Sequence, residues 1–203
     1  MDSKTHWEGV YTTKAVDEVG WYKPNFDVSL SLIAEAFPGP SARVLDVGGG
    51  ASLLVDNLLA RGYQQVAVLD IAAPALEHAK RRLEEKATSV KWLVADVREA
   101  NDLGQFDIWH DRAVFHFMVD AADRQKYAAV AKRTVPVGGH LIIATFSPTG
   151  PEQCSGLNTC RYSSSSLAVE LGDGFKLIKE VEELHMTPRG KSQSFIYALL
   201  LRV

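Results

Sequence analysis

Apolar runs alternate with amphipathic stretches along most of the chain, and this alternation predicts a parallel β-sheet covered by helices. The runs that predict buried strands are residues 43–47, 65–70, 90–95, 106–110 and 140–146. Helical spacing of apolar residues predicts helices at residues 27–36, 51–61, 74–85 and 121–134. Near the end the pattern changes, because residues 175–185 and 194–202 look like long strands joined by a polar turn. We therefore expect a terminal hairpin that adds one antiparallel strand to the sheet.

Length and composition favour a single globular domain spanning residues 1–203. Of the 203 residues, 46% are hydrophobic and 23% are charged, which are ordinary values for a protein with a full core. A net charge of −3 provides no basic field to hold a nucleic-acid backbone. The chain has no apolar stretch suited to a signal peptide or to a membrane span of roughly 18 residues. We expect a cytoplasmic monomer or homodimer with no nucleic-acid or membrane partner.

The most specific signal is a glycine turn directly after the first predicted strand. Asp46 stands two positions before Gly48, Gly49 and Gly50. Glycines let the backbone turn tightly and let a ligand come close, and the helix beyond the turn offers free N–H groups. A dinucleotide-binding turn of the form GxGxxG would need a glycine at Leu53. Leu53 therefore disfavours a dinucleotide, while Asp46 offers carboxylate oxygens to a cationic group of a ligand.

Two further aspartates follow later strands of the predicted sheet. Asp70 ends the second strand, where its carboxylate can accept hydrogen bonds from both hydroxyls of a ribose. Asp96 follows the third strand, where its carboxylate can accept from an adenine amino group and the Val97 N–H can reach a ring nitrogen. The alternatives are a helix cap for Asp70 and a solvated loop position for Asp96. Together the two aspartates predict a site for an adenosyl group.

Ionisable residues gather at the end of the fourth predicted strand, beside the point where open α/β sheets bind ligands. We take His110 as a candidate general base that also contacts the ligand, and Asp111 as the group that orients it. Arg112 is a candidate substrate contact. His116 follows within an apolar helical stretch, where it is either a core histidine or a substrate contact.

Taken in order, these segments resemble the class I S-adenosylmethionine-dependent methyltransferases, and the resemblance covers residues 43–146. It implies a Rossmann-like α/β fold, in which helices cover both faces of a seven-stranded mixed sheet with strand order 3-2-1-4-5-7-6 and an antiparallel last strand. It also implies S-adenosylmethionine as cofactor and S-adenosylhomocysteine as product. The implied cofactor residues are Asp46, Gly48, Gly49 and Gly50 at the methionine end, Asp70 with Ile71 at the ribose, and Asp96 with Val97 at the adenine. This chain departs from the fuller glycine pattern at Ser52.

The signals for the methyl acceptor conflict. The stretch that contains Trp7, Trp21 and Tyr22 looks like the lead-in of a subgroup that includes protein lysine methyltransferases. Residues 111–114, Asp-Arg-Ala-Val, look more like the thiopurine and chalcogen methyltransferases. The acceptor is therefore a small thiol, chalcogen or metalloid compound, or a protein lysine. Residues 1–40 are expected to cover the cofactor, with Trp21 either contacting it or packing onto the core.

The long connection at residues 147–166 is expected to form the substrate side of the site. Its Cys154 and Cys160 could line a pocket or bind a soft metalloid, and a flexible loop with incidental cysteines is the simpler interpretation. Two cysteines make neither a disulfide framework nor a zinc site, so no metal is expected. The final turn brings Arg189 to the same edge, as a contact for an anionic substrate or as a solvated side chain.

Two other functions share parts of this pattern. A nicotinamide-dependent oxidoreductase would have the same glycine turn and the same Asp70, but Leu53 counts against it. A non-catalytic adenosyl-binding protein on the same fold is the other alternative. Methyl transfer from a sulfonium depends mainly on proximity and alignment, so the reaction itself demands few catalytic residues. The sequence therefore predicts a methyltransferase whose acceptor stays open.

Overall fold

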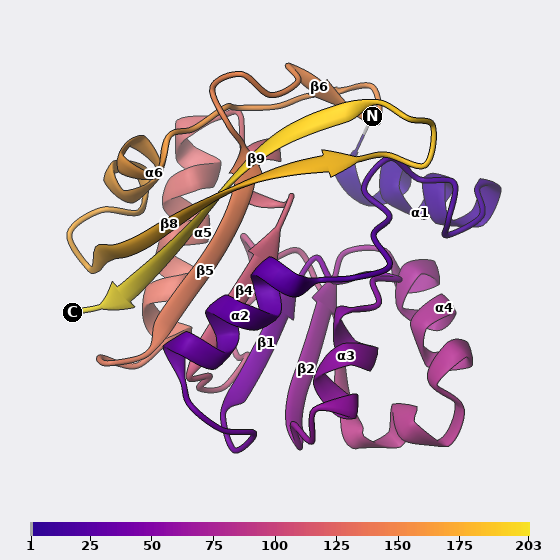
Figure 1. Ribbon diagram of the computed structural model, residues 1–203, viewed down its shortest axis with the longest axis horizontal. Coiled ribbons are helices and arrows are strands. Elements are labelled where there is room, and N and C mark those ends of the chain that lie inside the picture. The colour runs from indigo at the N-terminus through magenta and orange to yellow at the C-terminus, as the bar shows by residue number, and fades with distance from the viewer. Residues whose placement is uncertain (1) are drawn as a thin grey trace.

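The computed structural model describes residues 2–203, and its centre is one seven-stranded sheet (Figure 1). The strands of this sheet are β1 (Arg43–Val47), β2 (Gln65–Asp70), β3 (Val90–Val94), β4 (Ile108–Arg112), β5 (His140–Phe146), β8 (Phe175–Met186) and β9 (Ser192–Arg202). Their order is β3-β2-β1-β4-β5-β9-β8, and β9 runs antiparallel to both β5 and β8. Since β8 and β9 are the sixth and seventh strands of the sheet, the expected order and the antiparallel last strand are confirmed.

Helices cover both faces of the sheet, as expected. The helices are α1 (Ser3–Thr13), α2 (Asp27–Ala36), α3 (Leu54–Ala60), α4 (Ala73–Leu83), α5 (Ala121–Thr134) and α6 (Ser164–Leu171), with short 3₁₀ helices η1 (Glu84–Ser89) and η2 (Phe115–Phe117). α2, α3 and α4 bury Ile33, Leu54 and Leu76 in one cluster, and α5 and α6 bury Tyr127 and Leu167 in the other. The strands β2 and β5 are largely apolar between their ends because neither of their faces meets water, whereas β1 and β4 also bury Asp46, His110 and Asp111.

Helix α1 lies across the edge of the sheet above β1 and β2, apart from the two layers (Figure 1). Parallel strands end at this edge, so the glycine turn after β1 and the aspartates after β2 and β3 come together beneath α1. The same edge receives η2, which directly follows β4. The fold therefore brings together there most of the segments that the sequence singled out.

The fourth strand lies two residues later than predicted, which is a correction to the expected 106–110. β4 begins at Ile108 because Asp107, just before it, accepts hydrogen bonds from the backbone N–H and the guanidinium of Arg43. This pairing fixes the start of β4 against the start of β1. As a result, the ionisable residues from His110 to Arg112 lie inside the strand and are not in the loop beyond it.

Some elements were not predicted at all. The connection at residues 147–166 contains a small hairpin, β6 (Gln153–Cys154) paired with β7 (Leu157–Asn158), and the start of α6. The serine run forms a capping box at the start of α6. The Ser163 hydroxyl accepts a hydrogen bond from the Ser166 N–H, and the Ser166 hydroxyl accepts one from the Ser163 N–H. α3 is shorter than predicted, and the Ser52 hydroxyl accepts from the N–H of its first residue, Leu54.

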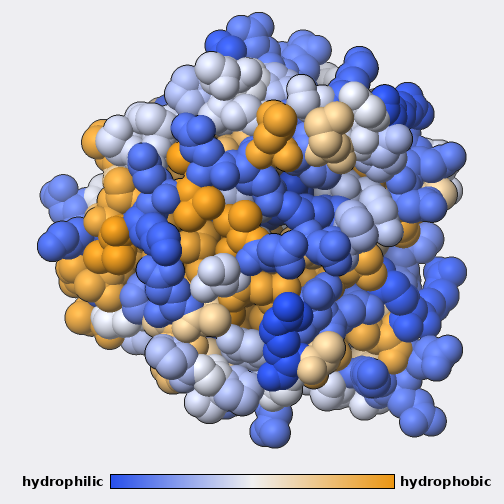
Figure 2. Space-filling model, viewed as in Figure 1, coloured by the Kyte–Doolittle hydropathy of each residue, from blue (hydrophilic) through white to orange (hydrophobic). Residues whose placement is uncertain are grey.

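The surface is mostly hydrophilic, with apolar residues gathered over the side of β5, β8 and β9 in Figure 2. β8 is the edge strand there, and its Ile178, Leu184 and Met186 are exposed. Among residues 2–203, no helix is both long and apolar enough to cross a membrane.

A buried hydrogen-bond network ties β4 to α5. The Asp111 carboxylate accepts from the backbone N–H groups of Val114 and Phe115 and, at 2.5 Å, from the Tyr127 hydroxyl. The Tyr127 oxygen accepts in turn from the Trp109 indole N–H at 2.8 Å. Trp109, Asp111 and Tyr127 are all fully buried, so this network satisfies groups that water cannot reach.

Replacing Tyr127 by phenylalanine is expected to lower the free energy of unfolding by about 1–3 kcal/mol, because the Trp109 N–H and one Asp111 oxygen then lack their buried partner. Urea unfolding at neutral pH measures the change. Tyr63→Phe is the matched control, since the Tyr63 hydroxyl hydrogen-bonds no protein group within residues 2–203, and we expect a change of less than about 0.5 kcal/mol there. Equal losses of unfolding free energy in Tyr127→Phe and Tyr63→Phe would contradict a stabilising role for the buried network of Trp109, Asp111 and Tyr127.

Candidate functional site

The glycine turn after β1 is packed so closely that side chains are excluded from it. A Cβ at Gly48 would lie 2.0 Å from Val114 Cγ2, and one at Gly49 would lie 2.4 Å from Asp46 Oδ2. Gly48 and Gly50 also have φ of 65° and 48°, a backbone region that favours glycine. The Gly48 N–H donates to the carbonyl of Leu69 at 2.6 Å, which holds the turn against β2.

Two cavities open beside this turn at the carboxyl edge of the sheet. The larger encloses about 810 Å³, its open mouth included, and the smaller about 480 Å³. Predicted cofactor residues that line the larger cavity are Trp21, Gly48, Asp70, Ile71, Asp96 and Val97. Asp46 and Gly49 line the smaller one, and Gly48, Trp21 and Arg112 line both. Gly50 and His110 are not among the lining residues, and Gly50 instead lies against Asp70.

Aromatic side chains from the N-terminal segment close over the larger cavity. Trp7 of α1 meets Trp21 and Phe117 edge to face, with ring centroids 5.4 and 5.1 Å apart. Trp21 donates its indole N–H to the Tyr11 hydroxyl at 3.1 Å. Trp7, Tyr11 and Phe117 were not predicted as site residues. The i, i+4 spacing of Trp7 and Tyr11 was the available signal, because it places both rings on one helix face.

Asp70 is a buried carboxylate at the floor of the larger cavity. Its Oδ1 accepts from the Ala72 N–H at 2.8 Å, and only 6% of the residue is exposed. Burial, together with the nearby charge of Asp46, raises the pKa of Asp70 to about 7, although backbone hydrogen bonds oppose the shift. A ligand hydroxyl that donated to this carboxylate would replace the solvation that burial removes.

Asp46 takes part in a buried chain of hydrogen bonds. Its Oδ1 accepts from His110 Nδ1 at 2.7 Å, and His110 Nε2 forms a hydrogen bond with the Ser29 hydroxyl of α2 at 2.9 Å. The other carboxylate oxygen, Oδ2, is buried and has no hydrogen-bond partner among residues 2–203. One carboxylate oxygen of Asp46 is therefore hydrogen-bonded to His110, and the other is free beside the smaller cavity.

The placement of His110 and Asp111 requires a correction of their roles. His110 is 1% exposed and both of its ring nitrogens are engaged, while Asp111 is fully buried in the network of β4 and α5. Burial raises the pKa of Asp111 to about 6 against the hydrogen bonds that it accepts. Neither side chain lines either of the two cavities. This geometry argues against a base at His110 and makes it a partner of Asp46.

Asp96 lies at the larger cavity with its carboxylate already held. Both oxygens accept from the Arg98 side chain, and Oδ1 also accepts from the Arg98 N–H at 2.9 Å. Partial burial favours the neutral acid, but these bonds and the charge of Arg98 hold the pKa of Asp96 below its usual value. The carboxylate is therefore ionised and fixed in place.

Arg112 reaches the wall shared by the two cavities. Its Nε donates to the Tyr197 hydroxyl at 3.0 Å, and its guanidinium lies 4.5 Å from the centroid of the Phe195 ring. Nη2 is buried, lies 3.8 Å from Glu183 Oε2, and makes no hydrogen bond within the described chain. Glu183 also pairs with Lys23, so two cations share one carboxylate and the cluster keeps an excess positive charge.

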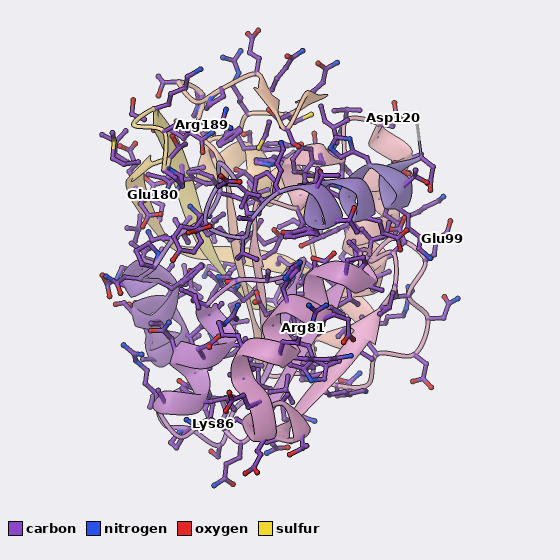
Figure 3. All side chains as sticks on the ribbon, turned by 90° about the vertical axis from the view of Figure 1, so that its right-hand side faces the viewer. Arg81, Lys86, Glu99, Asp120, Glu180 and Arg189 are labelled. Carbon is purple, nitrogen blue, oxygen red and sulfur yellow. The ribbon has the colours of Figure 1, made fainter. Side chains whose placement is uncertain are left out.

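The remaining predicted substrate residues are not brought together. Cys154 is buried in β6, where burial raises the pKa of its thiol to about 11, and half-buried Cys160 has its sulfur 3.9 Å from the Met118 carbonyl. Arg189 is exposed on the β8–β9 turn, away from α1 (Figure 3). No group of three or more metal-ligating side chains occurs within residues 2–203.

Gly49→Ala is expected to destabilise the protein by about 1–3 kcal/mol, because the new methyl group would overlap Asp46 Oδ2 and Val68 Cγ1. Thermal unfolding followed by circular dichroism measures the loss. Gly9→Ala is the control, since nothing lies within 4 Å of a Cβ there, and a helix interior favours alanine. A stable Gly49→Ala variant would show that the packing around the turn relaxes freely.

Part of the chain is similar to a known protein family. Residues 44–139 match the family described as "Methyltransferase domain". Nodulation protein S of Rhizobium tropici is 27% identical over 114 residues, which are 56% of this chain and 47% of that protein. The eEF1A lysine and N-terminal methyltransferase of Danio rerio is 25% identical over 151 residues, which are 72% of this chain and 22% of that protein. The chain thus spans less than half the length of both relatives.

The fold has close counterparts among solved structures. The N-methyltransferase NodS from Bradyrhizobium japonicum WM9, solved in complex with S-adenosyl-L-homocysteine, superposes with a TM-score of 0.75 at 13% identity. That superposition covers 99% of this chain and 99% of NodS. Residues 44–139 are therefore similar to a methyltransferase domain, and the chain has the fold of the class I S-adenosylmethionine-dependent methyltransferases that its motifs resemble.

Proposed function

We propose that this chain binds S-adenosylmethionine and transfers its methyl group to a small-molecule acceptor. The observation that carries the proposal is that one hydrogen-bond acceptor and one hydrogen-bond donor, both buried and both without a partner, belong to residues that line the same cavity. Asp46 Oδ2 can only accept a hydrogen bond and Arg112 Nη2 can only donate one. The methionine end of S-adenosylmethionine carries an ammonium group and a carboxylate, and these two groups would satisfy the two atoms.

The residues of the larger cavity fit the rest of this cofactor. Asp70 would accept from the ribose hydroxyls, and the backbone around Val97 would meet the adenine at the end of β3. The glycine turn would let the cofactor lie directly on the backbone. A nicotinamide dinucleotide fits less well, because it carries a pyrophosphate where this chain offers a free carboxylate oxygen.

When bound, S-adenosylmethionine supplies an activated methyl group with a good leaving group. The protein's part is to hold the donor and the acceptor in line, which can contribute most of the rate. The acceptor's electron pair forms the new bond to carbon, the carbon–sulfur pair stays on sulfur, and any proton on the acceptor leaves to water. Trp7, Trp21 and Phe117 would help to exclude water from this alignment.

A protein lysine is the second candidate acceptor, favoured by the name of the Danio rerio relative. A lysine must lose a proton before it attacks, so it requires a base. The nearby His116 and Cys154 do not fit that task, because burial lowers the pKa of His116 to about 3 and raises that of Cys154 to about 11. These values support a small acceptor that is nucleophilic at neutral pH without help.

Replacing Arg112 by methionine is expected to weaken S-adenosylhomocysteine binding by about tenfold or more, because a charged hydrogen bond to the carboxylate is lost. Calorimetric titration measures this affinity beside that of 5′-methylthioadenosine, which lacks the amino-acid end and should bind the variant as it binds the wild type. Arg189→Met, on the exposed turn, is the matched control and should change neither affinity. Equal losses for the two ligands would remove the assigned role of Arg112.

The wild-type protein itself tests the proposal in the same titration. Saturable binding of S-adenosylhomocysteine supports it. Binding of NADH without binding of S-adenosylhomocysteine would replace it with the oxidoreductase alternative. Cofactor binding without methyl transfer to any component of a cell extract would leave a non-catalytic adenosyl-binding protein.

Affinity for S-adenosylhomocysteine is expected to fall as the pH is lowered from about 8 to about 6. Ribose hydroxyls donate to the ionised form of Asp70, and protonation near its pKa of about 7 removes that acceptor. Below this pKa the affinity should drop towards tenfold per pH unit. Asp70→Asn should bind more weakly and show a flatter profile over the same range. If Asp70→Asn kept the wild-type dependence of affinity on pH, the titrating group would be a residue other than Asp70.

A further inference from the structure

Tyr11 carries a buried hydroxyl group from the N-terminal helix to the larger cavity. The residue belongs to α1, lines that cavity and is only 8% exposed. Its hydroxyl oxygen accepts a hydrogen bond from the Trp21 indole N–H at 3.1 Å. Within residues 2–203, no protein group accepts the proton of this hydroxyl. The proton is therefore available to a ligand in the cavity.

The Tyr11 hydroxyl and the Asp70 carboxylate approach each other beside Gly50. A Cβ at Gly50 would lie 3.0 Å from Asp70 Oδ2 and 3.0 Å from the Tyr11 hydroxyl oxygen, so the two oxygens are at most twice that distance apart. No hydrogen bond joins them in the described part of the chain, and Asp70 Oδ1 is already bonded to the Ala72 N–H. Burial and the nearby charge of Asp70 both raise the pKa of Tyr11, so the hydroxyl keeps its proton.

A place between a hydroxyl donor and an ionised carboxylate suits one kind of ligand group. Tyr11 has a proton to donate, and Asp70 Oδ2 can only accept one. A ligand atom held by both must therefore accept and donate at the same time, which an alcohol oxygen does. Two O–H···O bonds of about 2.7–2.8 Å each can bridge oxygens that lie this close. An ether or carbonyl oxygen at the same place would leave Asp70 unpaired.

Tyr11 is held in place at both of its ends. Its backbone carbonyl oxygen accepts from His78 Nε2 of α4 at 2.9 Å, and its hydroxyl oxygen accepts from Trp21. Its ring packs in a small cluster of buried alanines between these two anchors. A donor that is fixed before the ligand arrives loses little freedom on binding, so its hydrogen bond contributes more to affinity.

We infer that Tyr11 binds the cofactor: its hydroxyl donates to one ribose hydroxyl of S-adenosylmethionine, and the same ribose hydroxyl donates to Asp70 Oδ2. The inference rests on the proposed function, since it adds a residue of α1 to the ribose end of that site. Trp7 precedes Tyr11 by four residues on the same face of α1. The contact therefore also holds the aromatic cover of Trp7 and Trp21 over the bound cofactor.

Ligands that each lack one ribose hydroxyl test the inference. The probes are S-adenosylhomocysteine, its 2′-deoxy form and its 3′-deoxy form, and calorimetric titration measures the affinity of the protein for each. In the wild type, at least one deoxy form should bind about tenfold or more weakly than S-adenosylhomocysteine, because it loses its bonds to Tyr11 and to Asp70 together.

The variant Tyr11→Phe removes only the hydroxyl group. It should weaken the binding of S-adenosylhomocysteine about three- to tenfold, the loss expected for one neutral hydrogen bond. It should bind one of the two deoxy forms as the wild type does, because that ligand has no oxygen to accept the proton, and it should lose affinity for the other deoxy form as it does for S-adenosylhomocysteine. Tyr63→Phe, at a buried tyrosine that lines neither cavity, is the control and should match the wild type for all three ligands.

The pattern across the three ligands separates cofactor binding from a purely structural role. Equal fold-losses for all three ligands in Tyr11→Phe overturn the inference, because the hydroxyl would then only support the fold, and so does loss of the folded state in the circular dichroism of this variant. Unchanged affinities in Tyr11→Phe, or a wild type that binds both deoxy forms as well as S-adenosylhomocysteine, also overturn the inference and leave the proposed function standing. A wild type that fails to bind S-adenosylhomocysteine overturns the proposed function itself.

Discussion

The hydrogen bond between Asp46 and His110 is the constraint on which the site depends. The two residues are direct partners in the register of β1 and β4, and both are almost fully buried. A carboxylate in the middle of a sheet is costly unless it is paired and hydrogen-bonded. His110 provides that bond at 2.7 Å and is itself anchored by Ser29. The pair joins β1, β4 and α2 at the point where the cavities begin.

The shape of the glycine turn follows from this bond. With Oδ1 held by His110, the other oxygen of Asp46 points to the turn, where it would lie 2.4 Å from a Cβ at Gly49. The chain must therefore have glycine at this position, whether or not a ligand is present. The same close approach leaves Oδ2 beside the smaller cavity without a partner. One interaction thus explains both the glycine at Gly49 and the free acceptor.

Three buried aspartates at this edge differ in how well the protein satisfies them, and the difference separates structural from ligand-facing groups. Asp111 accepts three hydrogen bonds and stabilises the junction of β4, η2 and α5. Asp70 lines the cavity with its pKa raised to about 7, and Asp46 has a free oxygen. Since native proteins satisfy nearly all buried polar groups, the unsatisfied ones indicate where a ligand belongs.

Much of this arrangement follows from the sequence, because alternating apolar runs and the glycine turn are local signals. They predict the sheet, the helices α2 to α5, and the positions of Asp46, Asp70 and Asp96 at one edge. The role of His110 could not be predicted in this way, since it depends on the pairing of β4 with β1, which places His110 beside Asp46. The aromatic cover needed the packing of α1 against Trp21 and Phe117, contacts distant in sequence.

The acid–base properties of the residues at the carboxyl edge of the sheet argue for catalysis by alignment of the two substrates and not by proton transfer. His110 and Asp111 have all their hydrogen-bonding atoms engaged, and His116 and Cys154 are neutral near pH 7 because burial moves their pKa values in opposite directions. None of these groups is suited to take a proton from an acceptor. A site of this kind gains its rate from the alignment of two bound molecules and from the exclusion of water by Trp7, Trp21 and Phe117. The acceptor must then arrive with its electron pair already free.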